Sequence, residues 1–299
     1  MNAIEVNGLD FSYNKKSPLL QNVNMRIPQS GIYGFLGPNG AGKTTTLKLI
    51  LNLLKIDGEG EISVMGHSIN ATYPRYLTHI GSLIEEASVY QHLTIRKNLK
   101  IWSNYYGINS NRIDEVLEII GLSGASRKKV AALSTGMKRR LGIGIAILHD
   151  PEILILDEPT NGLDPIGIGD LRELMRNITA QGKTILLSSH ILSEVERLVD
   201  HIGVINHGSI VFEGTIQELN AKTVSTSHVS LYVSDSAIAF ECLSKYYSTQ
   251  IFENHIEVGI TSKGDINEIV KIIIENNISL HEVIRPKNTL ESLFLKLAK

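Results

Sequence analysis

Apolar and polar residues alternate along two stretches near the start of the chain, at residues 3–9 and 20–27. A period of two is typical of strands that bury one face, so these stretches predict two antiparallel strands. A short apolar run at 32–36 predicts the end of a third strand. Apolar residues at 47, 50 and 51 then have the spacing of a helix. The chain therefore begins with a β layer and continues with strand, turn and helix.

Further along, short continuous apolar runs predict strands that are buried on both faces, as in a parallel sheet. They lie at 80–84, 153–156 and 184–189. Residues 92–121 have a largely helical pattern, a helix is expected at 191–199, and 202–214 predicts a hairpin. These elements predict the α/β class, with an added antiparallel β layer and a helical subdomain.

The pattern changes after about residue 220, which divides the chain into predicted domains 1–220 and 221–299. Residues 221–228 are rich in Ser and Thr and predict a linker. The remainder predicts strand 229–234, helix 236–247, strand 249–253, strand 255–260, helix 265–276, strand 278–284 and helix 289–297. This β-α-β-β-α-β order suits a small ferredoxin-like α+β domain. It has no cluster of metal-ligand spacing, so we expect a packing or regulatory appendage.

Composition narrows the class of protein. The 299 residues carry a net charge of −2, which gives no electrostatic footprint for nucleic acid. The only cysteine, Cys242, excludes an internal disulfide. The first residues lack the pattern of a signal peptide, and the apolar stretch Leu141–Leu148 is too short to span a bilayer. We therefore expect a cytoplasmic protein that works at the inner face of the membrane only through a partner.

The most specific chemical signal follows the strand at 32–36. Residues Gly37–Thr44, GPNGAGKT, fit G-x-x-x-x-G-K-[ST] at every fixed position. Backbone N–H groups of such a loop and the following helix N-terminus bind phosphate. Lys43 supplies charge to the β- and γ-phosphates, and Thr44 supplies a hydroxyl ligand for Mg²⁺. The predicted ATP-binding residues are Gly37, Pro38, Asn39, Gly40, Ala41, Gly42, Lys43, Thr44 and Thr45; the alternative is a turn that only caps a helix.

Two acids, Asp157 and Glu158, follow the buried run at 153–156. Ligands of open α/β sheets bind at the carboxyl ends of strands. Asp157 is therefore expected to hold Mg²⁺, directly or through water, and Glu158 to accept a proton from water. The alternative interpretation of Asp-Glu-Pro is a surface turn.

Four other features allow both a functional and a structural interpretation. Ser134-Thr135-Gly136 opens a basic helix that could bind an anion or be an ordinary N-cap with solvated lysine and arginine. His190 ends the strand at 184–189, where a structural histidine is the common case. Tyr13 could stack on a base or only pack, and Asp164 before Pro165 is expected to cap a helix.

Taken together, the motifs over residues 3–220 resemble the ATP-binding subunit of an ABC transporter. Gly37–Thr44 is similar to its Walker A loop, Leu133–Met137 to its signature, Ile153–Glu158 to Walker B, Gly162–Asp164 to the D-loop and His190 to the switch histidine. The resemblance implies a head-to-tail homodimer in which each ATP lies between the Walker A loop of one chain and the signature of the other.

The same resemblance implies residue roles. Ser134 and Gly136 would contact the γ-phosphate across the dimer, with Asp164 nearby in the D-loop. Glu158 would be the general base, His190 would contact the γ-phosphate, and Tyr13 would stack on adenine. Closure on ATP would drive integral membrane permease subunits between conformations.

This chain departs from the family pattern at two places. Thr135 and Met137 replace a glycine and a glutamine of the signature, while Ser134 and Gly136 are kept. The loop after 80–84 usually carries a glutamine near Mg²⁺ and the attacking water. Glu85 is the matching residue and would serve in catalysis and as a metal ligand, although Glu86 is the alternative.

Glu85, its preceding strand and the Ser-Thr-Gly-Met-Lys signature are similar to the bacitracin-resistance and lantibiotic self-immunity branch. That resemblance implies export or expulsion of a peptide antibiotic. The alternatives are an exporter ATPase for lipid, drug or polysaccharide, and a soluble ABC ATPase without a membrane partner. A single phosphate loop and the absence of a heptad run in the sequence disfavour the latter.

Overall fold

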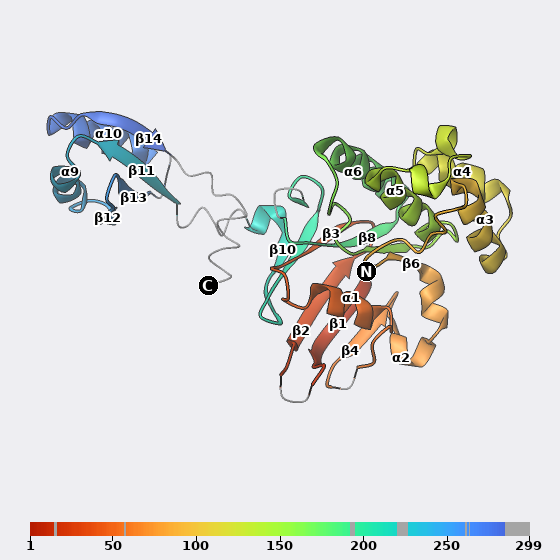
Figure 1. Ribbon diagram of the computed structural model, residues 1–299. Helices are drawn as coiled ribbons and strands as arrows, with labels where there is room; N and C mark the ends of the chain where they lie inside the picture. Colours follow the sequence, from red (N-terminus) through yellow and green to blue (C-terminus); the bar gives the residue numbers. More distant parts are fainter. Residues whose placement is uncertain are drawn as a thin grey trace. The chain divides into compact units, whose positions relative to one another are not determined.

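The computed structural model describes residues 1–14, 17–56, 58–191, 195–219, 227–260, 262 and 264–284. Contacts between residues divide the chain into two units, Met1–Ile216 and Gln217–Lys299 (Figure 1). The division thus falls between residues 216 and 217, rather than between 220 and 221 as the sequence predicts. The units are described separately below.

The first unit contains the predicted antiparallel β layer. It consists of β1 (Asn2–Phe11), β2 (Leu20–Pro28), β4 (Glu61–Val64) and β5 (His67–Ser68), in the order β2-β1-β4-β5. Every pairing in this sheet is antiparallel. Buried and exposed side chains alternate along most of β2, as the sequence pattern predicts for a sheet with one covered face.

A second sheet of the first unit is mainly parallel. Its strands are β3 (Gly31–Leu36), β6 (Ile80–Leu83), β7 (Ile153–Leu156), β8 (Thr184–Ser189), β9 (His201–Asn206) and β10 (Ser209–Thr215), in the order β10-β9-β3-β8-β7-β6. All pairings are parallel except the predicted β9–β10 hairpin. Every side chain of β7 and β8 is buried. Because the two strands pair in parallel, their carboxyl ends meet at one edge of the sheet.

Among the described residues of this unit, the α-helices are α1 (Lys43–Ile50), α2 (Ile69–Thr72), α3 (Ile95–Tyr106), α4 (Asn111–Ile119), α5 (Thr135–Ala146) and α6 (Pro165–Thr179). The predicted helical stretch 92–121 is two helices, because Gly107 takes a left-handed conformation with φ 68° that ends α3. The predicted helix 191–199 lies partly outside the described residues, since 192–194 are not described. Helices α3, α4 and α5 pack together as the predicted helical subdomain.

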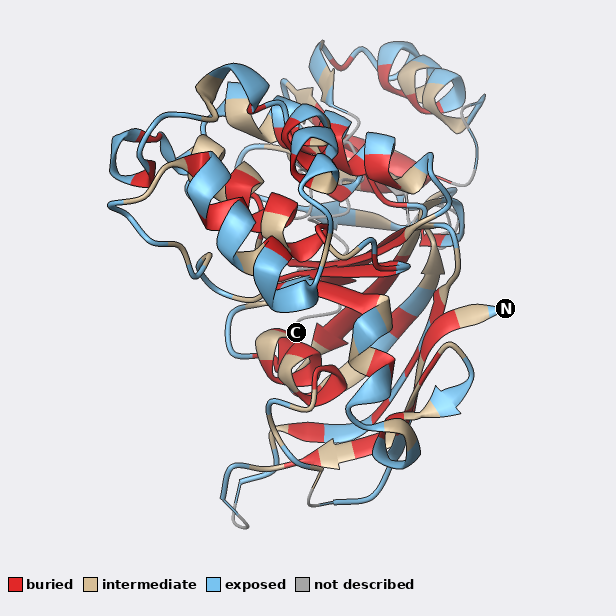
Figure 2. Cartoon of the chain, turned by 90° about the vertical axis from the view of Figure 1, so that its right-hand side faces the viewer, coloured by how far each residue is buried: buried red, intermediate tan, exposed pale blue. Residues whose placement is uncertain are grey.

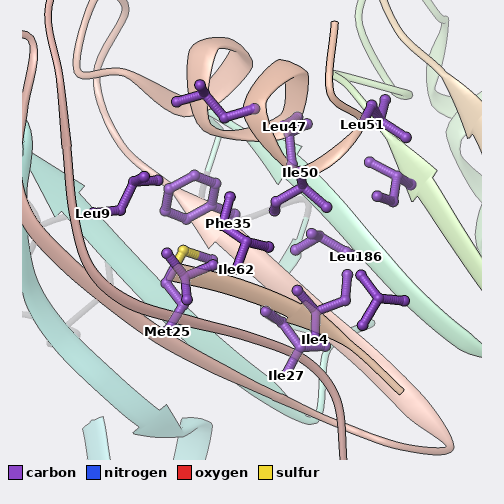
Figure 3. Packing of buried hydrophobic residues seen from close by; sticks show 14 of the residues in the cluster. Ile4, Leu9, Met25, Ile27, Phe35, Leu47, Ile50, Leu51, Ile62 and Leu186 are labelled. Carbon is purple, nitrogen blue, oxygen red and sulfur yellow. The ribbon is translucent and has the colours of Figure 1, made fainter. Parts of the chain in front are cut away.

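The core of this unit lies between the two sheets and includes α1. Phe35 of β3 and Leu47 and Ile50 of α1 belong to the same buried cluster as residues of β1, β2 and β4 (Figure 3). Figure 2 shows buried residues gathered on the central strands, whereas exposed residues lie on the outer surfaces of the helices. The glycine-rich turn between β3 and α1 is therefore anchored at both ends by buried elements.

The second unit has its own small core. Its elements are β11 (Ser227–Val233), α9 (Ser236–Leu243), β12 (Thr249–Ile251), β13 (Ile256–Ile260), α10 (Gly264–Glu275) and β14 (Leu280–Ile284). The four strands form an antiparallel sheet in the order β12-β13-β11-β14. The element order is the predicted one, but β11 already begins at Ser227, inside the predicted linker. The predicted helix 289–297 lies outside the described residues. Across the described part of the chain, no helix has both the length and the hydropathy of a membrane span.

Candidate functional site

The turn between β3 and α1 can be built only from glycine at two positions. Gly42, the N-cap of α1, has φ 109°, and a Cβ there would overlap the Leu20 side chain. A Cβ on Gly37 would lie 2.5 Å from the carbonyl oxygen of Ile205. Because Gly42 has no side chain to cap α1, the first N–H groups of this helix are left for a ligand.

This turn borders a cavity of about 390 Å³, which we call the phosphate cavity. Its lining comes from the residue before β2, the turn, the start of α1, and the loops after β7 and β8. The lining residues are Leu19, Asn39, Gly40, Gly42, Lys43, Thr44, Thr45, Glu158, Asn161 and His190. The structure therefore brings together residues of the loop, of the Asp-Glu pair and of the predicted switch histidine.

Lys43 is the buried cation of the phosphate cavity, with only 6% of its surface exposed. Its Nζ donates to the carbonyl oxygens of Gly37 at 2.8 Å and Pro38 at 3.2 Å, and lies 3.3 Å from Glu158 Oε1. A buried ammonium with one carboxylate beside it is suited to a polyanion, because a phosphate group would add compensating charge.

Thr44 and Asp157 bring oxygen atoms together beside Lys43. Thr44 Oγ1 donates to Asp157 Oδ2 at 2.9 Å and lies 3.2 Å from Oδ1. Hydroxyl and carboxylate oxygens are the donor set that Mg²⁺ prefers, usually with substrate phosphates and water as further ligands. Within the described residues, no three His, Cys, Asp or Glu side chains form a metal site, so the pair fits a nucleotide-bound magnesium rather than a dedicated all-protein cage.

Glu158 has its carboxylate between Lys43 and His190. Its Oε1 faces Lys43, and its Oε2 lies 2.8 Å from His190 Nδ1. Its backbone has φ 46°, a conformation that costs a non-glycine residue about 1–3 kcal/mol, so the surroundings must hold it in place. The geometry therefore presents one carboxylate at the edge of the phosphate cavity and orients it from both sides.

Glu85 lies outside the lining of the phosphate cavity. Its Oε1 accepts from Lys48 Nζ at 2.8 Å, and this hydrogen bond lowers the pKa of the Glu85 carboxyl. Its carbonyl oxygen accepts from Arg139 Nη1 at 3.0 Å, while burial lowers the pKa of that guanidinium. Glu86 borders a different cavity of about 230 Å³ between β6 and α5. The assignment of either glutamate to the metal stays a prediction.

Tyr13 is 60% exposed, and its ring packs in a T-shaped arrangement with that of Phe11 at a centroid distance of 5.0 Å. Its hydroxyl lies 3.3 Å from Oγ1 of Thr45, which lines the phosphate cavity. The ring is thus placed next to the cavity and is largely exposed, and stacking on adenine stays a prediction.

Ser134, Gly136 and Asp164 lie together, but on a second cavity of about 350 Å³, which we call the signature cavity. It lies at the N-termini of α5 and α6. Ser134 caps α5 by accepting from the N–H of Met137 at 3.3 Å, and Asp164 caps α6 by accepting from the N–H of Gly167 at 2.8 Å. The predicted cap at Asp164 is therefore present, and these residues do not border the phosphate cavity of their own chain.

Several polar residues of the site were not singled out from the sequence. They are Lys48, Arg139, Asn161 and Ser188. Ser188 could have been found, because it lies at the carboxyl end of a buried parallel strand, where ligands of open α/β sheets bind. The others depend on how separate elements pack, and no local pattern marks them.

Comparisons with known proteins agree with this geometry. The ABC transporter family matches residues 20–161. The bacitracin transport ATP-binding protein BcrA of Bacillus licheniformis is 40% identical over 93% of this chain and 92% of its own length. The lantibiotic transport ATP-binding protein SrtF of Streptococcus pyogenes is 43% identical over 70% of this chain and 90% of its own length.

The fold is shared as well. A solved ATP-binding subunit of an ABC transporter superposes with a TM-score of 0.65 and 30% identity, covering 74% of this chain and 92% of that structure. The phosphate cavity, the paired acids and these matches lead to one conclusion: the chain belongs to the ATP-binding proteins of the ABC transporter family, which are ATPases.

Proposed function

We propose that the chain is the ATP-hydrolysing subunit of an exporter that expels a membrane-active peptide antibiotic of the bacitracin or lantibiotic type. The observation that carries this proposal is the extent of the similarity to the bacitracin transport protein. That match covers 93% of the chain, so it includes most of the second unit, whereas the lantibiotic transport protein covers 70%. Similarity over the second unit therefore favours a function like that of the bacitracin transport protein over one like that of the lantibiotic transport protein.

Within the phosphate cavity, the residues divide the work of nucleotide binding. The N–H groups at the start of α1 and the Lys43 ammonium hold the phosphates. Thr44 and Asp157 would hold Mg²⁺, and the ion would supply positive charge beside the phosphates. Glu158, already aimed into the cavity, accepts the proton of the attacking water, and His190 orients the Glu158 carboxylate through their 2.8 Å contact.

The signature cavity supports a homodimer. Ser134 and Gly136 form a helix N-terminus that a phosphate of the same chain does not reach, because they lie on a cavity separate from Lys43. A nucleotide held by a second copy of the chain would supply an anion there. Two copies joined in this way enclose two nucleotides, and their closing and opening would move integral membrane permease subunits.

The central experiment uses Glu158→Gln. This change removes the proton acceptor but keeps the shape of the side chain. We expect nucleotide binding to be retained, turnover to fall below about one per cent of the wild type, and an ATP-bound dimer to accumulate, as size-exclusion chromatography with light scattering would detect. Robust hydrolysis by this variant would contradict the assignment of the base.

The substrate class needs a separate test in cells. The chain is expressed with its neighbouring membrane genes in a sensitive host, and growth inhibition by bacitracin, a lantibiotic and unrelated drugs is compared with the Glu158→Gln variant. Protection against the peptides alone supports the proposal. Protection only against unrelated drugs favours the lipid, drug or polysaccharide alternative, and failure of the chain to sediment with membranes favours an ATPase without a membrane partner.

A further inference from the structure

Ser188 lies at the centre of the site, although it does not border the phosphate cavity. It belongs to β8, which lies between β3 and β7 in the parallel sheet. Leu156 of β7 pairs with Leu187 of β8, so Asp157 and Ser188 are the next residues of neighbouring strands. The Ser188 side chain has no exposed surface.

One hydroxyl group of Ser188 contacts both members of the acidic pair. Ser188 Oγ donates to Asp157 Oδ1 at 2.6 Å and accepts from the backbone N–H of Glu158 at 2.9 Å. A hydroxyl has one donor and two acceptor positions, so both bonds form at the same time. The bond to the carboxylate is charge-assisted, and its short length agrees with that.

These two bonds have different consequences for the two acids. At Asp157 the bond from Ser188 engages Oδ1, and Oδ2 is the oxygen nearer to Thr44 Oγ1, at 2.9 Å against 3.2 Å for Oδ1. At Glu158 the other bond holds the backbone N–H. The φ of Glu158 is 46°, in the left-handed region. In this backbone conformation the Glu158 carboxylate reaches both Lys43 and His190.

We infer that Ser188 is the positioning residue of the Asp157–Glu158 pair, which selects Asp157 Oδ2 as the oxygen facing the metal and fixes Glu158 as the proton acceptor. The inference rests on the roles given to these two acids in the proposed function. A purely structural serine would add stability and leave the metal affinity unchanged. A positioning serine affects metal affinity and turnover while nucleotide binding without metal is preserved.

The test compares Ser188→Ala with Ser189→Ala in the full chain. Ser189 is the matched control, because it is 1% exposed on the same strand and its Oγ contacts only the backbone of Ile191 among the described residues. Manganese(II), which accepts the same oxygen ligands as Mg²⁺, is titrated by electron paramagnetic resonance with a non-hydrolysable ATP analogue present. Binding of the analogue without metal, kcat and KM are measured alongside.

For Ser188→Ala we expect manganese affinity to fall about tenfold, the size of a lost hydrogen bond to a charged group. We expect a lower kcat, with KM and metal-free nucleotide binding within about twofold of the wild type. Ser189→Ala keeps wild-type values. If Ser188→Ala does not fold, Ser188→Cys replaces it, since a thiol keeps the shape but hydrogen-bonds weakly.

Two results overturn the inference in different ways. Equal manganese affinity in the wild type and in the folded Ser188 variant, with only the melting temperature lowered, would leave Ser188 a structural residue. Absence of manganese binding by the wild type with the analogue would instead remove the metal role of Asp157, and with it this part of the proposed function.

Discussion

The phosphate cavity and the signature cavity have similar volumes, about 390 and 350 Å³, and both lie at helix N-termini. They differ in how those helices begin. Helix α1 starts from Gly42, which has no side chain to cap it, whereas α5 and α6 start from Ser134 and Asp164, which each accept from an N–H group of their own helix. The first helix therefore offers more of its N–H groups to a ligand than the other two do.

The two cavities also differ in charge. Lys43 places a buried ammonium beside the first cavity. The second contains Arg140, which lies 3.7 Å from Asp170, together with the carboxylate of Asp164. A helix N-terminus alone thus does not make a strong anion site. In the proposed function, the signature cavity becomes an anion site only when a second chain brings its nucleotide.

The largest expected effect concerns the phosphate cavity. Lys43→Met removes its cation and leaves Glu158 without that partner, so nucleotide affinity should fall roughly 10- to 100-fold. Calorimetric titration of nucleotide measures this. Lys271→Met, at an exposed lysine of the second unit, is the control and should bind as the wild type does. Unchanged nucleotide affinity in Lys43→Met would show that the buried ammonium does not distinguish the phosphate cavity from the signature cavity.

The next prediction tests whether the signature cavity serves self-association rather than nucleotide binding within one chain. A Cβ on Gly136 would lie 3.7 Å from Leu163, so Gly136→Leu can begin without backbone strain and then fill the signature cavity. We expect nucleotide affinity within about twofold of the wild type. Self-association in the Glu158→Gln background should weaken roughly tenfold or more, as light scattering would detect. Gly124→Leu, at an open position, is the control. A dimer of normal strength would contradict the homodimer proposal.

A smaller effect is expected from the caps. Ser134→Ala and Thr94→Ala each remove an N-cap hydrogen bond, of α5 and α3 respectively, and should cost about 1 kcal/mol of stability. Calorimetry should record similar falls in melting temperature, of roughly 2–4 °C. Only Ser134→Ala should also lower ATP turnover. Equal turnover in the two variants would mean that Ser134 is an ordinary cap.

The smallest effect is expected at Glu85, whose carboxyl pKa lies below its ordinary value of 4.5 because Lys48 donates a hydrogen bond to it. A carboxyl with a lowered pKa stabilises the fold above its unfolded pKa, and this contribution is lost as the pH falls through the folded pKa. The exposed pair should therefore matter little, and Glu85→Gln should bind nucleotide within roughly twofold of the wild type. Melting curves of the two proteins should differ slightly at neutral pH and coincide well below pH 4.5. Complete loss of nucleotide binding in Glu85→Gln would show that the role of the loop after β6 is assigned wrongly.

Local sequence predicted much of the fold because its signals are short-range. Alternation at 20–27 gave a strand with one buried face, and the fully apolar run at 153–156 gave a strand buried on both faces. Errors came where one residue decides a boundary. Gly107 breaks the predicted helical stretch 92–121 by adopting a left-handed conformation, and no periodicity of apolar residues signals that choice.

The sequence by itself determined the phosphate loop, since the left-handed Gly42 and the charge of Lys43 are local features, although the close approach of Ile205 to Gly37 is a tertiary contact. It also determined which acids end the buried strand. Only the tertiary structure decided that Ser188 joins Asp157 to Glu158, and that Glu85 pairs with Lys48 outside the phosphate cavity. The physical reason is that strand order and helix packing bring together residues far apart in the chain, and these contacts leave no periodic trace in the sequence.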